Sequence, residues 1–492
     1  DCYITSKLNG FLGLLPAAEG EPSDAPDAPR LQKGPAYGAE IADLRSEISS
    51  MKSGISNLKS EISKADWPTY RHDAGRSGAT AVAVPAPLET VWQADLGGAL
   101  TAPVVAGGRV IVARKDSREV VALNATDGRE LWRYTAAGRL DTPPTIDAGR
   151  VVFGCADGWV YCLRAGDGEL LWRFRAAPRE RLIGAFGYPE SAWPVHGSVL
   201  VSDGTAYCTA GRSSFLDGGI DAWALNVASG EIVARERLSS DHDMTVDSGR
   251  NQTIDTGVLS DLLVAHEGGI YLRQRPLFGT GREAGIVGHL RATGGLLDTS
   301  WFHRTRWFLG GVPFAEYLVF NEKSVCGVRA RRNIGGYGLH FTPGAEGFEL
   351  FAADHAAPQP PKPTPKAASK PAAKAGPAKQ NPGLRKGKSD TPKLRRPQDR
   401  WCIRIPVRAT AMVIAGDTLI VAGTPDVIDP TDAWAAYEGR KGGNLLTVSV
   451  ADGAIGTRMD LASPPVLDGL AVARGRLFMT TAGGQVVCMG RK

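Results

Sequence analysis

From Leu88 onward, short apolar runs alternate with turns that contain glycine, and the pattern repeats about every 40 residues. Three tryptophans mark the repeat: Trp92, Trp132 and Trp172. Residues 122–134 (ALNATDGRELWRY) align with residues 162–174 (CLRAGDGELLWRF). Each unit contains four short strands joined by Gly or Asp-Gly turns, which favour hairpins. A four-stranded unit of this length is typical of a β-propeller blade.

The repeat continues, less regularly, to the C-terminus. The third blade is predicted at 195–238, the fourth at 259–307, the fifth from 314 with an interruption, the sixth at 409–461 and the seventh at 463–488. The seventh lacks its outer strand, whereas residues 88–96 form such a strand with no blade before it. Pairing the two would close the ring and remove both free edges. The sequence therefore predicts an all-β, seven-bladed propeller over residues 66–492, closed by an N-terminal strand.

Two segments precede the propeller. Residues 1–35, with a stretch rich in Pro, Ala and acidic residues, are interpreted as the remnant of an upstream region plus a linker. Residues 36–65 predict a short amphipathic helix with a heptad of apolar residues: Ile41, Leu44, Ile48, Met51, Ile55, Leu58 and Ile62. The heptads could form a parallel dimer. Three heptads are also marginal as an isolated helix, so a surface or linker helix is the alternative.

The charge of the chain is concentrated in one insertion. The net charge is +5, but residues 356–400 hold twelve Lys/Arg against two Asp, which leaves about −5 for the remainder. This Pro/Lys/Ala-rich segment lacks the apolar residues of a core and is predicted to be a disordered insertion in the fifth blade. It is either a tether to a polyanion or acidic surface, or a solvated insertion. The folded part is not expected to bind nucleic acid, and no apolar run is long enough to span a membrane.

The sequence contains no recognisable set of catalytic or metal-binding residues. The seven cysteines form no CxxC and no zinc-type cluster, and Cys162 and Cys488 occupy the same position in two aligned repeats, as buried core residues would. Asp241-His242-Asp243 lacks a partner cluster. No nucleophile elbow, phosphate loop or dinucleotide fingerprint is present.

Chemistry is therefore sought where the chain departs from its repeat. In the third blade, residues 191–198 and 211–219 are irregular and supply candidate ligand-binding residues on one face: His196, Arg212, Ser213, Ser214 and Asp217. Arginine, hydroxyls and glycine amides could hold an anion or a sugar. Equally, Arg212 and Asp217 could tie down a long hairpin.

A second departure, residues 297–307, is dense in aromatic and basic residues and adds His303 and Arg304 to the candidates. This segment could stack a ligand. Alternatively, it is an irregular strand whose tryptophans pack between blades.

The unit at 122–134 resembles the PQQ-like repeat family, which includes quinoprotein alcohol dehydrogenases and the outer-membrane assembly scaffold BamB. The approach at 67–78 (WPTYRHDAGRSG) is similar to the lead-in of large exported planctomycete PQQ-binding-like propeller proteins. The resemblance implies an extracytoplasmic location, in the periplasm or cell envelope. Dehydrogenases of this family typically have eight blades and an adjacent Cys-Cys pair. Because this sequence departs from both, neither PQQ nor another cofactor is expected.

The sequence analysis favours a non-catalytic binding or scaffolding module of an exported bacterial protein. Its partner would be a protein, or a small polar or anionic ligand, on one face of the propeller. The alternative is a quinoprotein-type, PQQ-dependent dehydrogenase or another enzyme with a site on that face. A repeat motif of this kind specifies the fold far better than the function.

Overall fold

The computed structural model describes residues 29–38, 63–185, 187–239, 258–280, 288–292, 307–310, 315–330, 347–355 and 399–491. The heptad residues of the predicted helix (41–62), His303, Arg304 and nearly all of the basic insertion lie outside these ranges, so those predictions stay predictions. Every regular element in the described part is a β-strand. No helix there is long and apolar enough to cross a membrane.

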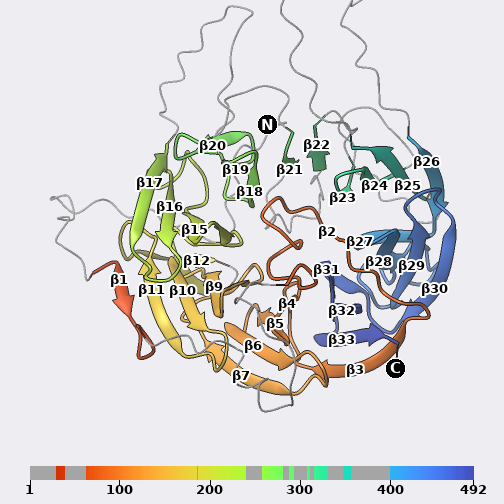
Figure 1. Cartoon of the computed structure of the whole chain (residues 1–492), viewed down its shortest axis with the longest axis horizontal. Helices are drawn as coiled ribbons and strands as arrows, with labels where there is room; N and C mark the ends of the chain where they lie inside the picture. Colours follow the sequence, from red (N-terminus) through yellow and green to blue (C-terminus); the bar gives the residue numbers. More distant parts are fainter. Residues whose placement is uncertain are drawn as a thin grey trace, which may run out of the picture.

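The sheets are arranged as blades around a ring (Figure 1). The first blade is β4 (Val104–Ala106), β5 (Arg109–Arg114), β6 (Glu119–Asn124) and β7 (Glu130–Thr135). The second is β8 (Thr145–Asp147), β9 (Arg150–Gly154), β10 (Trp159–Arg164) and β11 (Leu170–Arg175). A small hairpin, β12 (Leu182–Ala185) and β13 (Tyr188–Ser191), precedes the third, which is β14 (Leu200–Ser202), β15 (Thr205–Ala210), β16 (Ile220–Asn226) and β17 (Ile232–Leu238).

The fourth blade is irregular. Its sector holds a three-stranded sheet and a separate pair, in place of one continuous blade. These are β18 (Leu263–His266), β19 (Gly269–Leu272), β20 (Arg275–Leu277), and β21 (Leu290–Ala292) with β22 (Trp307–Leu309). The fifth blade is regular again, with β23 (Tyr317–Phe320), β24 (Ser324–Ala330), β25 (Phe348–Asp354) and β26 (Trp401–Ile405).

The sixth blade is β27 (Val407–Ala415), β28 (Thr418–Pro425), β29 (Gly443–Ser449) and β30 (Ile455–Leu461). The seventh is β31 (Pro465–Ala473), β32 (Arg476–Thr481) and β33 (Gln485–Gly490), completed by β3 (Glu89–Asp95). β3 pairs antiparallel with β33, and Trp92 lies opposite Cys488. The predicted closure of the ring by an N-terminal strand is thereby confirmed.

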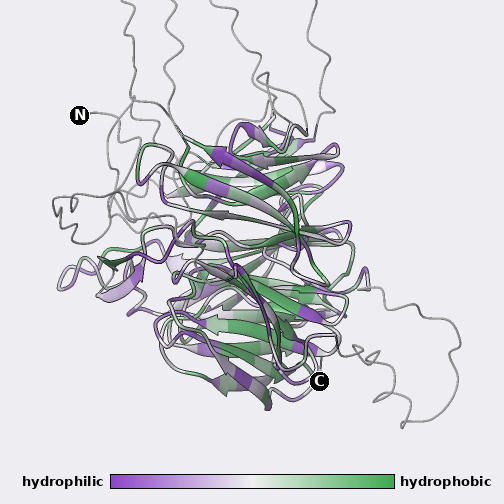
Figure 2. Ribbon diagram, turned by 90° about the vertical axis from the view of Figure 1, so that its left-hand side faces the viewer, coloured by the Kyte–Doolittle hydropathy of each residue, from purple (hydrophilic) through white to green (hydrophobic). Residues whose placement is uncertain are grey.

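Neighbouring blades are joined by a repeated contact between a tryptophan and a glycine. The indole of each outer-strand tryptophan donates a hydrogen bond to a carbonyl in the next blade: Trp92 to Ala125, Trp132 to Ala165, Trp172 to Val227 and Trp401 to Val450, at 2.9–3.2 Å. A glycine of positive φ lies against each ring: Gly128, Gly168, Gly230 and Gly453. The blade interiors are hydrophobic, and polar side chains gather towards strand ends and turns (Figure 2).

The segment before β3 lines the inside of the ring. We call residues 65–80 the inner belt; it includes β2 (Ala79–Thr80), which pairs in parallel with β27. Its backbone hydrogen-bonds to blades in ring order: Ala65 to Arg474, Trp67 to Val105, Pro68 to Ile146, Ala74 to Ala265, Ser77 to Phe320 and Gly78 to Ile414. These residues belong to blades seven, one, two, four, five and six. The belt therefore ties the inner strands together (Figure 1).

Buried charges anchor the belt. Arg71 donates to Asp468 at 2.7 Å, and the same carboxylate accepts hydrogen bonds from the hydroxyls of Tyr70 and Tyr317. Arg76 is fully buried and donates to the carbonyls of Tyr70 and Leu263. Burial lowers the pKa of Arg76 to about 10, against the opposing effect of the Asp73 and Tyr70 charges.

One short strand was not predicted. Residues 31–33, which sequence analysis places at the end of a linker, form β1 (Leu31–Lys33) and pair antiparallel with β11 as a fifth strand. The pattern of three mixed residues carries no strand signal of its own. The partner strand supplies the order.

The tryptophan–glycine joint predicts a large difference between two neighbouring glycines. A Cβ on Gly168 would lie 2.6 Å from the Trp132 ring, and its φ is +77°, whereas a Cβ on Gly166 would meet nothing within 4 Å. Gly168→Ala should therefore destabilise the protein by roughly 2–4 kcal/mol. Gly166→Ala should change the free energy of unfolding by less than about 0.5 kcal/mol. Urea denaturation of both variants measures this, and equal effects would contradict the joint.

The belt predicts a matched pair of aspartate substitutions. Asp468→Asn keeps the shape and tolerates the residue's positive φ, but leaves the buried Arg71 without its countercharge. We expect a loss of roughly 3 kcal/mol. Asp460, which is exposed and accepts a hydrogen bond from Asn444, is the control, and Asp460→Asn should stay within about 0.5 kcal/mol. Similar denaturation midpoints for the two variants would show that the belt contact stabilises nothing.

Candidate functional site

The candidate residues of the third blade lie on one face of the ring, as predicted. In an antiparallel blade, the turn between the second and third strands and the connection to the next blade emerge on the same side. We call this side the connection face. His196 follows β13 in the connection between the second and third blades, and Arg212 to Asp217 form the β15–β16 turn. Both therefore belong to the connection face.

A chain of polar contacts runs across this face from the first blade to the third, from the half-exposed Asp116 to buried side chains. Arg139 pairs with Asp116 and with Asp141, both at 3.2 Å. Asp141 accepts a hydrogen bond from His196 Nδ1 at 2.6 Å, and His196 Nε2 lies 3.9 Å from Glu190 Oε1. Arg139 thus lies between Asp116 and Asp141, and His196 lies between the carboxylates of Asp141 and Glu190.

The chain ends in the ion pair between Glu190 and Arg212. Arg212 also donates to the carbonyl of Ser191 at 3.3 Å. These contacts fix the β12–β13 hairpin to the third blade through Nη2 of the guanidinium, whereas Nη1 is buried without a hydrogen-bond partner among the described residues.

The electrostatics of the cluster follow from its burial. Burial alone would raise the pKa of Asp141, but the charge and hydrogen bond of His196, with the charges of Arg139 and Lys115, bring it below its usual value. Burial lowers the pKa of Lys115, partly offset by Asp141. The cluster is thus arranged to keep the Asp141 carboxylate ionised, which suits a structural ion pair better than a general acid.

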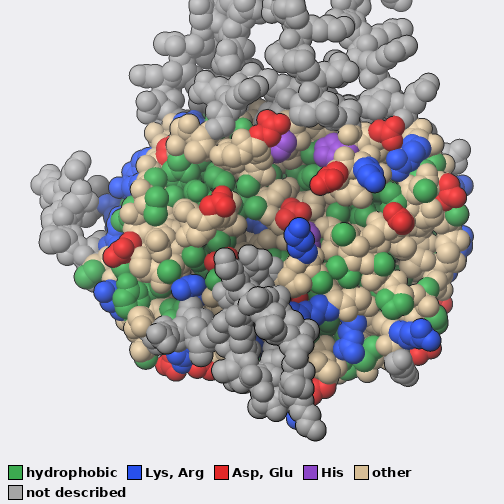
Figure 3. Space-filling model, in the orientation of Figure 1, with side chains coloured by type: hydrophobic (Ala, Val, Ile, Leu, Met, Phe, Trp, Pro, Cys, Tyr) green, Lys and Arg blue, Asp and Glu red, His purple; other side chains and the backbone are tan. Residues whose placement is uncertain are grey.

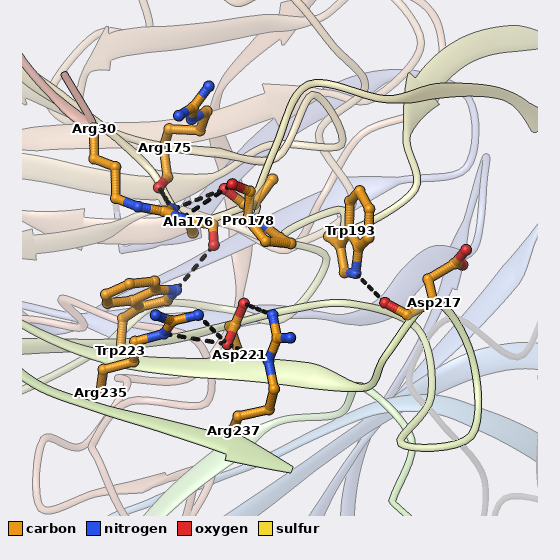
Figure 4. A network of polar contacts seen from close by, with 11 residues as sticks. Arg30, Arg175, Ala176, Pro178, Trp193, Asp217, Asp221, Trp223, Arg235 and Arg237 are labelled. Atoms are coloured by element: carbon orange, nitrogen blue, oxygen red, sulfur yellow. Dashed lines mark hydrogen bonds and ion pairs between the residues drawn. The ribbon is translucent and has the colours of Figure 1, made fainter. Parts of the chain in front are cut away.

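The other candidate residues of the third blade also make contacts within the protein. Ser214 Oγ accepts a hydrogen bond from the Val258 amide at 2.8 Å, and Ser213 Oγ accepts one from the Phe215 amide at 3.2 Å. Asp217 pairs with Arg181 at 2.9 Å. Its carbonyl accepts a hydrogen bond from the indole of Trp193 (Figure 4). These contacts favour the interpretation that Arg212 and Asp217 tie down a hairpin. Ligand binding by this set stays a prediction.

Trp307, at the end of the second irregular segment, packs inside the protein. It is buried, forms a bridge with Ala315, and lies under the guanidinium of Arg71 at 4.8 Å from the ring centre. This position favours the alternative in which the tryptophans of that segment pack between blades.

Sequence reasoning missed two features of the connection face. Asp141 and Glu190 complete the charge chain, but nothing in the sequence links them to His196. The second feature is the loop from Asp426 to Gly442 in the sixth blade, where Val427, Ile428 and Trp434 are about half exposed. An exposed tryptophan outside the repeat position was the signal available for it.

The described residues offer no metal centre. None of their His, Cys, Asp and Glu side chains come together in a group of three or more that could hold a metal ion. The six cysteines in the described ranges are free thiols, and all except Cys402 are buried. On the face seen in Figure 3, acidic and basic side chains of the described residues are interspersed, with hydrophobic side chains between them.

His289 is a buried histidine that the candidate list did not include. Its Nε2 donates to the carbonyl of Arg273, and its ring stacks on Tyr271 with 4.2 Å between centroids. Burial lowers its pKa to about 4, although the hydrogen bond to Arg273 works in the opposite direction.

The lowered pKa of His289 predicts an acid-sensitive fourth blade. Between about pH 6.5 and 4 the unfolded chain binds a proton at this residue and the folded chain does not, so stability falls as the pH falls through this window. The loss should be on the order of 2–3 kcal/mol by pH 4. His289→Phe should flatten this part of the stability curve. Urea titrations at several pH values measure the slope, and parallel curves for the two proteins would contradict the assignment.

Residues 80–259 match a family model described as outer membrane protein assembly factor BamB. A search of curated proteins returned no match. Among solved structures, BamB from Moraxella catarrhalis is 13% identical with a TM-score of 0.35, covering 84% of this chain and 91% of its own.

A quinohemoprotein alcohol dehydrogenase from Comamonas testosteroni is also similar. It is 11% identical with a TM-score of 0.44, covering 87% of this chain and 81% of its own. At these TM-scores, neither structural likeness supports a conclusion about function.

Proposed function

The chain is a PQQ-like β-propeller protein, and on that premise we propose that it is a non-catalytic binding or scaffolding module of an exported bacterial protein. The partner would be another protein, docked on the connection face. The proposed extracytoplasmic location draws on the family model matched by residues 80–259, which describes an outer membrane protein assembly factor.

The observation that carries this proposal is the inner belt. Its side chains Tyr70, Arg71 and Arg76 are buried and hydrogen-bonded to inner strands, so they fill the inside of the ring where a flat cofactor would need space. We therefore expect that the chain does not bind a quinone inside the ring.

Two further features support a protein partner. The ion pairs from Asp116 to Arg212 join the first blade, the β12–β13 hairpin and the third blade, and a fixed surface of this kind suits a protein partner. The same face exposes Val427, Ile428 and Trp434 on one loop. Aromatic and aliphatic side chains of this kind are typical anchors of protein interfaces.

The non-catalytic half of the proposal is tested by reconstitution. The full chain is incubated with PQQ and Ca²⁺, dialysed, and assayed for retained quinone and for dye-linked oxidation of alcohols and sugars. We expect neither stoichiometric quinone nor oxidation above the blank. Stoichiometric quinone together with oxidation would replace the proposal with the dehydrogenase alternative.

The binding half is tested with matched surface variants in an envelope extract of the source bacterium. The amount of partner protein retained by an Ile428→Ser/Trp434→Ser variant should be at least about tenfold lower than the amount retained by the wild type. Ile232→Ser/Val233→Ser, on the exposed outer strand β17, is the control and should retain it. Retention by both variants would remove the sixth-blade loop from the proposed interface.

A further inference from the structure

Residues 30–37 lie along the outer edge of the second blade, and we call them the strap. β1 pairs antiparallel with β11, with Leu31 opposite Phe174 and Lys33 opposite Trp172. Beyond β1, the amides of Gly34 and Ala36 donate to the carbonyls of Leu171 and Leu170 at 2.8 and 3.1 Å. Figure 1 shows β1 outside the ring, beside β11. The strap is thus an added edge strand.

The first side chain of the strap enters a site made of carbonyls and an aromatic ring. Arg30 Nη1 donates to the carbonyls of Arg175 and Ala177 at 2.9 and 2.8 Å, and Nη2 donates to that of Pro178 at 3.1 Å. Its guanidinium lies over the ring of Trp223, 5.1 Å from the centroid (Figure 4). Planar guanidinium with forked donors suits this arrangement, and the compact ammonium of lysine does not.

The remaining residues of the strap fit the groove sterically. A Cβ on Gly230 would come within 2.7 Å of Leu31 Cδ1, so the glycine leaves the space that the leucine fills. A Cβ on Gly34 would lie 2.1 Å from the Leu170 carbonyl oxygen, which excludes any side chain there. Ala36 is buried, and the Tyr37 hydroxyl donates to the Ser229 carbonyl at 3.3 Å. The groove therefore accommodates five kinds of residue at fixed spacing: an arginine at position 30, an aliphatic residue at 31, a glycine at 34, a small residue at 36 and a tyrosine at 37.

The second blade differs from the first in that the strap covers its outer residues. Leu171 is 4% exposed under the strap, whereas Leu131, its counterpart in the first blade, is 45% exposed. Trp172 is fully buried, while the equivalent Trp132 keeps 7% exposure. Trp223 stands where the first two blades have Val121 and Tyr161 in the aligned repeats. Because of these differences, the joint between the second and third blades forms a groove that fits the strap, whereas the joint between the first and second blades does not.

Ring closure does not require the strap, because β3 already completes the seventh blade. We propose that the groove between the second and third blades is a recognition site for an extended peptide segment, and that the strap occupies it as a tethered ligand. The partner is a protein that presents an extended segment with arginine followed by an aliphatic residue and, three positions later, glycine. Its strand would pair with β11 by β-augmentation and displace the strap.

This site is separate from the connection face of the proposed function, and the two can fail independently. A ligand that belongs to the same chain competes at a high effective concentration with a free peptide. A free peptide should therefore bind weakly to the wild-type protein and more tightly once the strap is unseated.

The test uses the full chain and a fluorescent peptide of residues 28–38 (APRLQKGPAYG). Gly34→Val should unseat the strap, because its side chain would clash with the Leu170 carbonyl. Fluorescence anisotropy should then show at least about tenfold tighter binding of the peptide than to the wild type. Gly38→Asn is the matched control, since asparagine tolerates the φ of +75° at this position and a Cβ there meets nothing within 4 Å, and it should bind as weakly as the wild type.

Two more measurements decide the outcome. Peptides carrying Arg30→Ala or Gly34→Val should bind at least about tenfold more weakly than the natural sequence. Hydrogen exchange at the Arg175 amide, which donates to the Arg30 carbonyl, reports whether the strap is seated. If the Arg175 amide of the Gly34→Val variant still exchanges slowly, the strap is still seated, and an Arg30→Ala/Leu31→Asp variant replaces Gly34→Val in the binding test. An unseated strap without peptide binding overturns the proposal, and so do equal affinities for all peptides. Protection in both variants would show a permanent strand and would also overturn it.

Discussion

The contact between an outer-strand tryptophan and a glycine of the next blade is the interaction on which this ring depends. Blades can surround an axis only if neighbouring sheets meet at a constant angle, and a large flat ring pressed on a glycine sets that angle. The indole N–H is satisfied by a carbonyl of the same turn, so the joint buries no unpaired donor. In the third and sixth blades, Ala234 and Thr457 take the tryptophan's place in the aligned repeat, so these two joints lack the contact.

The belt solves a second problem that the repeat creates. Inner strands converge on the axis, and their backbone groups there need partners. One segment satisfies them in ring order and brings the charges of Arg71 and Arg76 into the interior, where Asp468 and carbonyls must compensate them. Such charges are costly to bury and costly to unpair, so the belt fixes the blades relative to one another. Because the belt fills the inside of the ring, we expect ligands or partners to bind at the faces of the ring or at the outer edges of its blades.

The fold could be predicted because the sequence pattern of a blade repeats along the chain. The candidate site could not, because it depends on contacts between residues that are far apart in the sequence. Trp92 and Cys488 could be matched from the repeat alone, and β3 does pair with β33. His196 was singled out because it interrupts the repeat, but Asp141 lies 55 positions away and only the closed ring brings it within 2.6 Å. Leu31 was assigned to a linker for a related reason: its strand character comes from β11, not from its own sequence.

Closing a propeller removes the two edges at the ends of the chain, but the outermost strand of every blade remains an edge. Charged side chains protect such edges against unwanted pairing. β7 carries Glu130 and Arg133, and β17 carries an Arg-Glu-Arg run, so both edges are protected in this way. β11 has leucine at the position of Glu130, and its edge is covered by β1 instead. A charged edge excludes all partners, whereas a covered edge admits a partner that matches the groove better than the cover does. This difference makes the outer edge of the second blade a place where pairing can be selective.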